Sequence, residues 1–314
     1  MKIPLLILIE SVHDFLPVIE DRGFRCILAT TSEQRAQAIR DHADEIRVVL
    51  TRGATGFYAE EMAALPRLEL ICSLGVGFEN IDLAAARARG VRVTHGPGAN
   101  ATSVADHAMA LLLGAARHLP QADAWVRQGH WNGFMGPQVS GKRLGIVGLG
   151  TIGQEIAKRG AHGFGMTVGY YNRRPRPESG YTYYDSALAL AEASDFLVVA
   201  TPGGADTRHL VNADVLEALG PQGYLVNIAR GSVVDTEALI AALAGRRIAG
   251  VGLDVVEGEP VVPPALLKLD NVVLTPHSAG RSPEAVSATV ALFLENATAH
   301  FAGKPVLTPV PQQG

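Results

Sequence analysis

Residues 142–160 read KRLGIVGLGTIGQEIAKRG, and this stretch decides how we interpret the rest of the chain. An apolar, β-prone run at 144–147 predicts a strand that is buried on both faces. Three glycines follow in the spacing GxGxxG, and apolar residues then recur at helical intervals as far as Phe164. The stretch therefore predicts a strand, a sharp turn and a helix whose N-terminus can bind an anion.

The three glycines have separate roles if this turn binds a dinucleotide. Gly148 permits the tight turn, Gly150 lets a pyrophosphate approach the backbone, and Gly153 lets the helix pack closely on the strand. We expect the cofactor to contact the turn at Gly148, Leu149, Gly150, Thr151, Ile152 and Gly153.

The residues after the next apolar strand, at 166–171, indicate which dinucleotide is preferred. An acidic residue that binds the ribose 2′-hydroxyl would lie about 20 residues past the motif, but Asn172 stands there, followed by Arg173 and Arg174. Two guanidinium groups suit a 2′-phosphate, so we expect NADP(H) to be preferred over NAD(H). The alternative is that both arginines are solvated at the start of a polar loop.

Composition indicates an ordinary globular protein. The 314 residues are 47% hydrophobic and 18% charged, and a net charge of −4 gives no footprint for nucleic acid or an anionic membrane. Two cysteines offer no disulfide framework or metal pair. The apolar run at the N-terminus is too short for a signal sequence, and no run reaches the length of a membrane helix. We therefore expect a cytoplasmic protein without a bound metal.

The chain alternates short apolar strands with helices, which is typical of α/β folds with doubly wound parallel sheets. We expect a substrate-binding domain at 1–98 and 284–314, with a dinucleotide-binding domain at 99–283 inserted into it. Ser103 and Asp106 resemble an N-cap pair ahead of a long helix at 104–119. The predicted strands lie at 5–9, 24–28, 46–50, 68–73, 91–94, 144–147, 166–171, 196–200, 224–228, 250–255 and 272–274.

Two further segments suggest binding surfaces. Residues 73–77, SLGVG, follow a strand, and their backbone N–H groups could hold a carboxylate; an ordinary turn explains them as well. Residues 121–138 read as a glycine-rich connection that carries Trp125, Trp131, Phe134 and Met135. These side chains favour a subunit interface, with packing inside the chain as the alternative.

Three polar residues follow strands at the edge where doubly wound sheets bind ligands. They are Arg230 in NIARGSVVD, Glu259 in LDVVEGEP and His277 in LTPHSAG. An arginine can bind a carboxylate bidentately while an imidazole exchanges a proton with the reacting oxygen. Glu259 beside His277 would favour the charged imidazolium. Taken singly, each could be a surface cap, a solvated turn residue or a loop histidine.

At this point the sequence resembles the D-2-hydroxyacid dehydrogenase family over nearly its whole length. The matching motifs are SLGVGFENID, GKRLGIVGLGTIG, NIARGSVVD, GLDVVEGEP and TPHSAG, in that order. Within the family, the NADPH-dependent glyoxylate/hydroxypyruvate reductases and the hydroxyphenylpyruvate reductases look most similar, because YTYYDSALALAEASDFLVVA and GKPVLTPV resemble segments of theirs. The Asn172-Arg173-Arg174 run fits the same branch.

The resemblance implies roles for individual residues. Arg230 orients the keto acid, His277 is the acid/base, Glu259 is its partner, and Asp254 helps to hold the nicotinamide carboxamide. The implied substrate contacts are Arg52, Leu74, Val76, Gly77, Arg230 and His277. Beyond the glycine turn, the expected cofactor contacts are Asn172, Arg173, Arg174, Thr201, Pro202, Thr207, Ile228, Ala229, Asp254, His277, Ala279 and Gly280.

Members of the family are usually homodimers joined through the nucleotide-binding domain, which would explain the aromatic segment around Trp131. The chain departs from the family pattern at two places. Ser278-Ala279-Gly280 follows His277 where many members have Ile-Gly, and Phe78 stands where Tyr or another residue is frequent. Either departure could alter the choice of substrate without touching the chemistry.

The expected reaction is NADPH-dependent reduction of a small 2-keto acid, glyoxylate, hydroxypyruvate or an aryl pyruvate, to the D-2-hydroxy acid by hydride transfer. Two alternatives remain open. An NAD-linked phosphoglycerate dehydrogenase often has a C-terminal regulatory domain, and this sequence shows none. A nucleotide-sensing corepressor can keep all three polar residues, so turnover with a keto acid would distinguish it from an enzyme.

Overall fold

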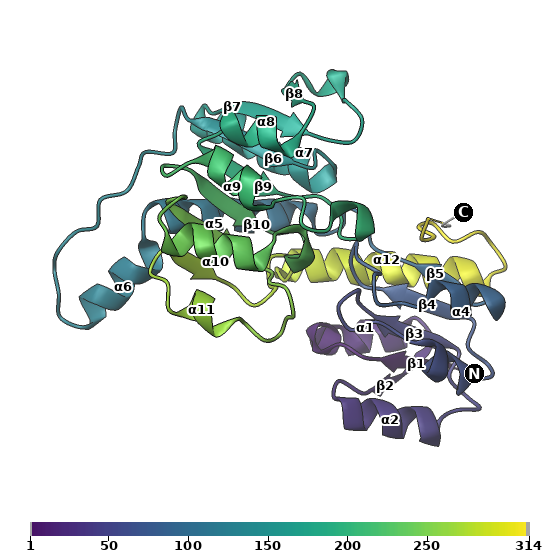
Figure 1. The fold of residues 1–314 in the computed structure, drawn as a ribbon. Coiled ribbons are helices and arrows are strands. Elements are labelled where there is room, and N and C mark those ends of the chain that lie inside the picture. The colour runs from purple at the N-terminus through teal and green to yellow at the C-terminus, as the bar shows by residue number, and fades with distance from the viewer. Residues whose placement is uncertain (1, 312–314) are drawn as a thin grey trace. The chain divides into compact units, whose positions relative to one another are not determined.

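The structure, a computed structural model, describes residues 2–311. It divides into two compact units, the second of which, Ala101–Ala279, is inserted into the first. Each unit contains one sheet whose strands are all parallel (Figure 1). The predicted α/β class with two doubly wound parallel sheets is therefore confirmed.

The first unit is built on a five-stranded sheet in the order β2-β1-β3-β4-β5. Its strands are β1 Ile3–Ile7, β2 Phe24–Leu28, β3 Val48–Thr51, β4 Leu70–Ser73 and β5 Arg92–Thr94. Its helices are η1 Glu10–Phe15, α1 Leu16–Asp21, α2 Ser32–Asp41, α3 Ala59–Ala63, α4 Leu83–Ala88 and α12 Pro283–Phe301.

Burial on both faces explains the continuous apolar runs of this sheet. Along β1, Leu5 and Ile7 pack in one cluster that includes Phe293 of α12, whereas Leu6 packs in a second cluster on the other face. Successive side chains of a strand point to opposite faces. The long helix α12, begun by the Ser282 side chain at the N-cap, therefore closes one face of the first sheet.

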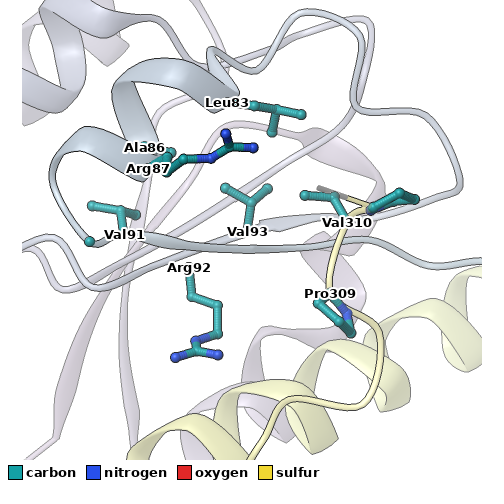
Figure 2. A pocket seen from close by; sticks show the side chains of 10 residues that line it. Leu83, Ala86, Arg87, Val91, Arg92, Val93, Pro309 and Val310 are labelled. Atoms are coloured by element: carbon teal, nitrogen blue, oxygen red, sulfur yellow. The ribbon is translucent and has the colours of Figure 1, made fainter. Parts of the chain in front are cut away.

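The outer edge of β5 is covered by the segment before the C-terminus. The backbone N–H of Val310 donates to the Val93 carbonyl at 3.1 Å, and Thr94 forms an antiparallel bridge with Pro309. Beside this segment lies a mostly apolar hollow of 510 Å³, lined by Leu83, Ala86, Arg87, Gly90, Val91, Arg92, Val93, Pro309, Val310 and Pro311. Figure 2 shows the Val93 and Arg92 side chains on opposite faces of β5.

The second unit is built on a seven-stranded sheet in the order β12-β11-β10-β9-β6-β7-β8. Its strands are β6 Arg143–Val147, β7 Thr167–Tyr171, β8 Thr182–Tyr184, β9 Phe196–Val199, β10 Tyr224–Asn227, β11 Gly250–Leu253 and β12 Val272–Leu274. Its helices are α5 Ala101–Ala116, α6 Leu119–Arg127, α7 Thr151–Lys158, η2 Arg159–Gly163, η3 Pro177–Ser179, α8 Ala187–Glu192, η4 Ala205–Thr207, α9 Ala213–Leu219, η5 Gly231–Val233, α10 Thr236–Ala244 and α11 Pro264–Leu267.

Helices cover both faces of this second sheet (Figure 1). Phe196 and Val198 of β9 pack in a cluster with α5 and α7, whereas Leu197 and Val199 pack in a cluster with α8, α9 and α10. The strand order reverses at β6, which lies between β7 and β9. Doubly wound sheets bind ligands at such a reversal, beyond the carboxyl ends of the strands.

Three details of the predicted element order are wrong. The long helix begins at Ala101, so Ser103 and Asp106 lie inside it and do not cap it. The segment 121–138 is not entirely a loop, because α6 occupies its first part. Neither the strand β8 nor the helix α8 was predicted; β8 is short, and its first two residues are exposed.

The segment that contains α6 is exposed to solvent. No residue of α6 is buried, and Trp131 and Met135 are 87% and 96% exposed. The Trp125 ring lies tilted against the His130 ring, at 4.3 Å between centroids, and meets the Phe134 ring edge to face. Figure 1 shows α6 and the following loop extending outward from the sheet of the second unit. We call residues 119–136 the aromatic arm.

Within residues 2–311, no helix is long and apolar enough to cross a membrane.

Candidate active site

The turn between β6 and α7 has the form that the glycine motif predicts. Gly148 has a φ of +102°, which side chains rarely adopt, and a Cβ there would lie 2.7 Å from the Thr201 backbone nitrogen. A Cβ on Gly153 would lie 2.1 Å from the Gly148 carbonyl oxygen, so helix and strand pack closely. Around the Cβ position of Gly150, by contrast, the described residues leave open space. The turn therefore fits an anionic group placed against the backbone at a helix N-terminus.

Asn172 follows β7, at the position where an acidic residue would bind the ribose 2′-hydroxyl. Its side-chain oxygen accepts a hydrogen bond from the backbone N–H of Leu149 at 2.8 Å. The amide thus ties the end of β7 to the glycine turn and holds the turn in place. An aspartate could accept the same bond, but it would bring a negative charge to this position.

The Arg173 guanidinium has an acidic neighbour that sequence reasoning missed. Arg173 forms an ion pair with Asp206 at 3.1 Å, and both side chains are more than three-quarters exposed. Asp206 lies in η4, next to Thr207, whose hydroxyl donates to the Pro202 carbonyl at 2.8 Å. The loop after β9 is therefore folded on itself and reaches the loop after β7. Nothing in the spacing of the sequence indicates this contact.

His277 and Glu259 are in direct contact. The distance from the imidazole Nδ1 to the Glu259 carboxylate is 2.7 Å, and both side chains are about one-third exposed. Because a carboxylate can only accept, Nδ1 carries the proton of this bond and Nε2 is directed elsewhere. His277 adopts the left-handed region, with a φ of +49°, which is uncommon for a residue with a side chain.

Arg230 reaches the same region through a close backbone contact. The next residue, Gly231, begins η5, and a Cβ there would lie 2.0 Å from the backbone carbon of Val256. This approach brings the loop after β10 against the loop after β11, which carries Glu259. The Arg230 guanidinium donates to the Ala229 carbonyl at 2.6 Å, and its side chain lies against Gly203.

The charges of this cluster act on Glu259. Burial by itself would raise the pKa of the Glu259 carboxyl, but the hydrogen bond from His277 and the charges of His277 and Arg230 hold that pKa below its ordinary value of 4.5. The carboxylate is therefore ionised at neutral pH. Among the described residues, no group of three or more histidine, cysteine or acidic side chains could hold a metal ion.

Asp254, which follows β11, is engaged with the segment that carries His277. One carboxylate oxygen accepts from the Thr275 hydroxyl at 2.6 Å and from the Ser278 N–H at 2.8 Å. The other accepts from the Ala279 N–H at 3.0 Å. Ile228 and Ala229 are buried at the end of β10. The expected contacts of these residues with a cofactor stay predictions.

Other predicted site residues lie in the first unit. The Ser73 hydroxyl donates to the Gly77 carbonyl at 2.5 Å, and the His95 ring lies 2.9 Å from the Val76 carbonyl oxygen. Leu74 follows β4 directly, and Arg52 contacts the Thr55 hydroxyl at 3.3 Å. Gly280, an expected cofactor contact, also belongs to this unit. None of them lines the hollow of Figure 2.

Comparison with known proteins decides the family. The profile described as "D-isomer specific 2-hydroxyacid dehydrogenase, NAD binding domain" matches residues 109–279. The chain therefore belongs to the D-isomer specific 2-hydroxyacid dehydrogenases. This dehydrogenase is 41% identical to the hydroxyphenylpyruvate reductase of Plectranthus scutellarioides over 293 residues, which are 92% of this chain and 93% of the relative. It is 42% identical to the 2-ketogluconate reductase of Gluconobacter oxydans over 308 residues, 96% of this chain and 98% of that one.

A solved structure resembles the dehydrogenase over nearly its full length. The NADPH-dependent glyoxylate/hydroxypyruvate reductase of Sinorhizobium meliloti, solved with NADP and malonate, is 38% identical and has a TM-score of 0.84. The match covers 99% of this chain and 97% of that chain. The dehydrogenase is therefore an NAD(P)-dependent enzyme of a family that reduces 2-keto acids such as glyoxylate and hydroxypyruvate. The roles of individual residues stay predictions.

Two further residues of the dehydrogenase contact the His277 segment and were not singled out for it. The Ser103 hydroxyl donates to the Ala279 carbonyl at 2.7 Å, and the His107 ring lies 2.9 Å from the Thr275 hydroxyl. Both side chains project from α5. Residues four apart lie on the same face of a helix, so the sequence could have predicted that Ser103 and His107 lie side by side.

Proposed function

We propose that this enzyme uses NADPH to reduce a small 2-keto acid, such as glyoxylate or hydroxypyruvate, to the D-2-hydroxy acid. The observation that carries the proposal is the 2.7 Å contact between His277 and Glu259, with Arg230 close enough for its charge to act on the same carboxylate. An imidazole supported in this way can donate a proton from Nε2 to a carbonyl oxygen. Bound NADPH would supply the hydride.

The three residues of this cluster have distinct proposed roles. Glu259 holds the charged imidazole of His277 with Nδ1 fixed, so that Nε2 can present the proton. Arg230 binds the substrate carboxylate and stabilises negative charge that grows on the reacting oxygen. In the first unit, the N–H groups of Val76 and Gly77 are proposed to bind the carboxylate as well. Contacts of the Val76 carbonyl with His95 and of the Gly77 carbonyl with Ser73 fix the backbone of this loop.

A panel of keto acids tests this proposal. Glyoxylate, hydroxypyruvate, hydroxyphenylpyruvate and 2-ketogluconate would be assayed with NADPH by the loss of nicotinamide absorbance. The last two substrates are included because two relatives of this chain are a hydroxyphenylpyruvate reductase and a 2-ketogluconate reductase. We expect turnover of at least one, and a fall in kcat of roughly 10²- to 10⁴-fold in His277→Ala, which is the usual contribution of a general acid. Normal turnover in that variant would contradict the role of His277.

We also propose that NADPH is preferred over NADH. The glycine turn fits a pyrophosphate, and Arg173 and Arg174 follow β7, where Asn172 stands in place of the acidic residue that would repel a 2′-phosphate. Replacing both arginines by glutamine should weaken NADPH binding much more than NADH binding, as measured by nicotinamide fluorescence. An unchanged ratio of the two dissociation constants would leave both arginines as solvated surface residues.

A homodimer is a further proposal, and the exposed aromatic arm supports it. Trp131 and Met135 expose apolar surface of a kind that is enriched at protein interfaces. Sedimentation of the enzyme should give twice the mass of the chain, and the double change Trp131→Ser and Met135→Ser should shift it toward the monomer. A wild-type monomer would exclude this arrangement.

A cytoplasmic location also stays a prediction, supported by two unpaired cysteines.

A further inference from the structure

Two side chains on one face of α5 form hydrogen bonds with the segment that carries His277. Thr275 precedes His277 by two residues, and Ala279 follows it by two. The first is contacted by His107 and the second by Ser103, which lie one helical turn apart on α5. The same helix thus holds the segment on both sides of the imidazole. A residue in the left-handed region, such as His277, needs this kind of support from its surroundings.

The contact at Thr275 has a defined direction. The Thr275 hydroxyl has one proton, and it donates that proton to the Asp254 carboxylate at 2.6 Å. The bond between His107 Nε2 and the same hydroxyl, at 2.9 Å, must therefore run from the imidazole to the oxygen. His107 is a donor in both its neutral and its charged form if Nε2 carries the proton, so this chain of bonds does not depend on its charge.

Asp254 accepts hydrogen bonds from several groups of the segment that carries His277. Its side chain is 1% exposed, and His107 Nε2 lies 3.4 Å from the same oxygen that accepts from Thr275. The carboxylate accepts from the N–H groups of Ser278 and Ala279, and the Asp254 carbonyl accepts from the His277 N–H at 2.8 Å. Three consecutive N–H groups of the segment therefore bond to one buried residue. A buried carboxylate is strongly bound by its hydrogen bonds, because losing a donor is costly there.

We propose that Ser103 and His107 are positioning residues of this enzyme, which fix the segment 275–279 so that the His277 imidazole keeps its place against Glu259. The inference rests on the proposed function only for the claim that His277 transfers a proton. Neither residue forms a hydrogen bond or a ring contact with the imidazole, so their effect on the reaction passes through Thr275, Asp254 and the backbone. Misplacing a reacting group by a small distance can cost a large factor in rate.

Hydrogen exchange in the enzyme without cofactor tests the contact by itself. In His107→Leu, the amides of Ser278 and Ala279 should exchange about fivefold faster, the effect of one buried hydrogen bond. In His107→Gln they should exchange as in the wild type, because the glutamine amide can donate from nearly the position of Nε2. Thr275→Val should match His107→Leu, and Thr275→Ser should be silent. His162→Leu, an exposed residue of η2 in the same unit, serves as the matched control.

Kinetics on the same variants test the effect on the reaction. We expect kcat to fall about tenfold in His107→Leu and Thr275→Val, with recovery in His107→Gln and Thr275→Ser. Exchange rates that match the wild type in both apolar variants would overturn the contact, and faster exchange with normal kcat would overturn the positioning role. Neither outcome depends on His277→Ala, whose normal turnover would instead remove the proposed function.

Discussion

Glu257 and Glu259 lie two residues apart and have different partners. Glu259 contacts His277, whereas Glu257 accepts hydrogen bonds from His209 at 3.0 Å and from the Thr236 hydroxyl at 2.9 Å. Either glutamate of the sequence EGE could have been the partner of a histidine on spacing alone. Glu259 was predicted because it follows a strand, although Glu257 follows the same strand; the resemblance to the family then gave Glu259 its role as the partner of His277.

The two glutamates give a matched pair of variants. Glu259→Gln should lower kcat by about tenfold or more, because the amide can still accept from Nδ1 but no longer stabilises a charged imidazole. Glu257→Gln should leave kcat unchanged and lower the melting temperature, because His209 and Arg208 lose their acidic partner. Equal effects of the two changes on kcat would show that the contact with His277 is not special.

Asp206 should weaken the binding of NADPH by competing for Arg173. The ion pair between them is exposed, so the competition is modest, and Asp206→Asn should tighten NADPH binding by about threefold. The dissociation constant for NADH should not change. In an Arg173→Gln background, the Asp206 substitution should have a much smaller effect. Fluorescence titration of the four proteins with both nucleotides measures this, and weaker NADPH binding in Asp206→Asn would contradict the competition.

At the scale of elements, the fully buried strands were predictable, whereas two elements without a buried residue, β8 and α6, were not. The runs that became β9 and β10 consist of residues that are all buried, and such runs stand out in a sequence. The edge strand β8, Thr182–Tyr184, has no buried residue, and α6 buries none of its side chains. Without burial, the hydrophobic periodicity that identifies an element is missing.

In the candidate site, the local glycine turn was predictable, whereas contacts between residues far apart in the sequence were not. The glycine turn was predictable because its spacing reflects a local backbone geometry that few residues allow. The contact of Arg173 with Asp206 joins loops 33 residues apart, and that of His107 with Thr275 spans 168 residues. Such contacts depend on how the strands are ordered in the sheet, and no local pattern encodes that order.

Gly231 controls the distance between the loops that carry Arg230 and Glu259. A Cβ at this position would meet the backbone of Val256 and Glu257, which cannot move aside as a flexible side chain could. Gly231→Ala should therefore separate the two loops, destabilise the protein by about 1–3 kcal/mol and lower kcat. Gly163→Ala, in a position with open space around the Cβ, is the control and should be neutral or stabilising. Thermal melts and initial rates on both variants give the comparison.

At the scale of the whole molecule, the ionised side chains predict how stability depends on pH. Hydrogen bonds from Arg143 lower the pKa of Asp195, and those from Lys158 and Arg159 lower the pKa of Glu155. The pKa of Glu259 is lowered as well. A carboxyl whose pKa is lower in the folded state stabilises that state above its ordinary pKa, and this contribution is lost as pH falls through the folded value.

The free energy of unfolding should therefore be highest near neutral pH and should decrease as the pH falls below about 4.5, the ordinary value for glutamate. Denaturant unfolding at a series of pH values between neutrality and acid measures this dependence. Asp195→Asn should be less stable at neutral pH and should lose less stability on acidification than the wild type. An equal slope in the two proteins would show that the bond with Arg143 does not contribute.

The pairing of the segment 308–310 with β5 predicts a role for this segment in preventing aggregation. Its backbone takes up the N–H of His95 and the carbonyl of Val93, groups that a strand at the margin of a sheet would otherwise offer to any other extended chain. Pro309 and Pro311 flank the last of these bonds and cannot donate one themselves. A chain truncated before residue 306 would lack this pairing and would leave the edge of β5 exposed. We expect such chains to aggregate by pairing of these exposed edges.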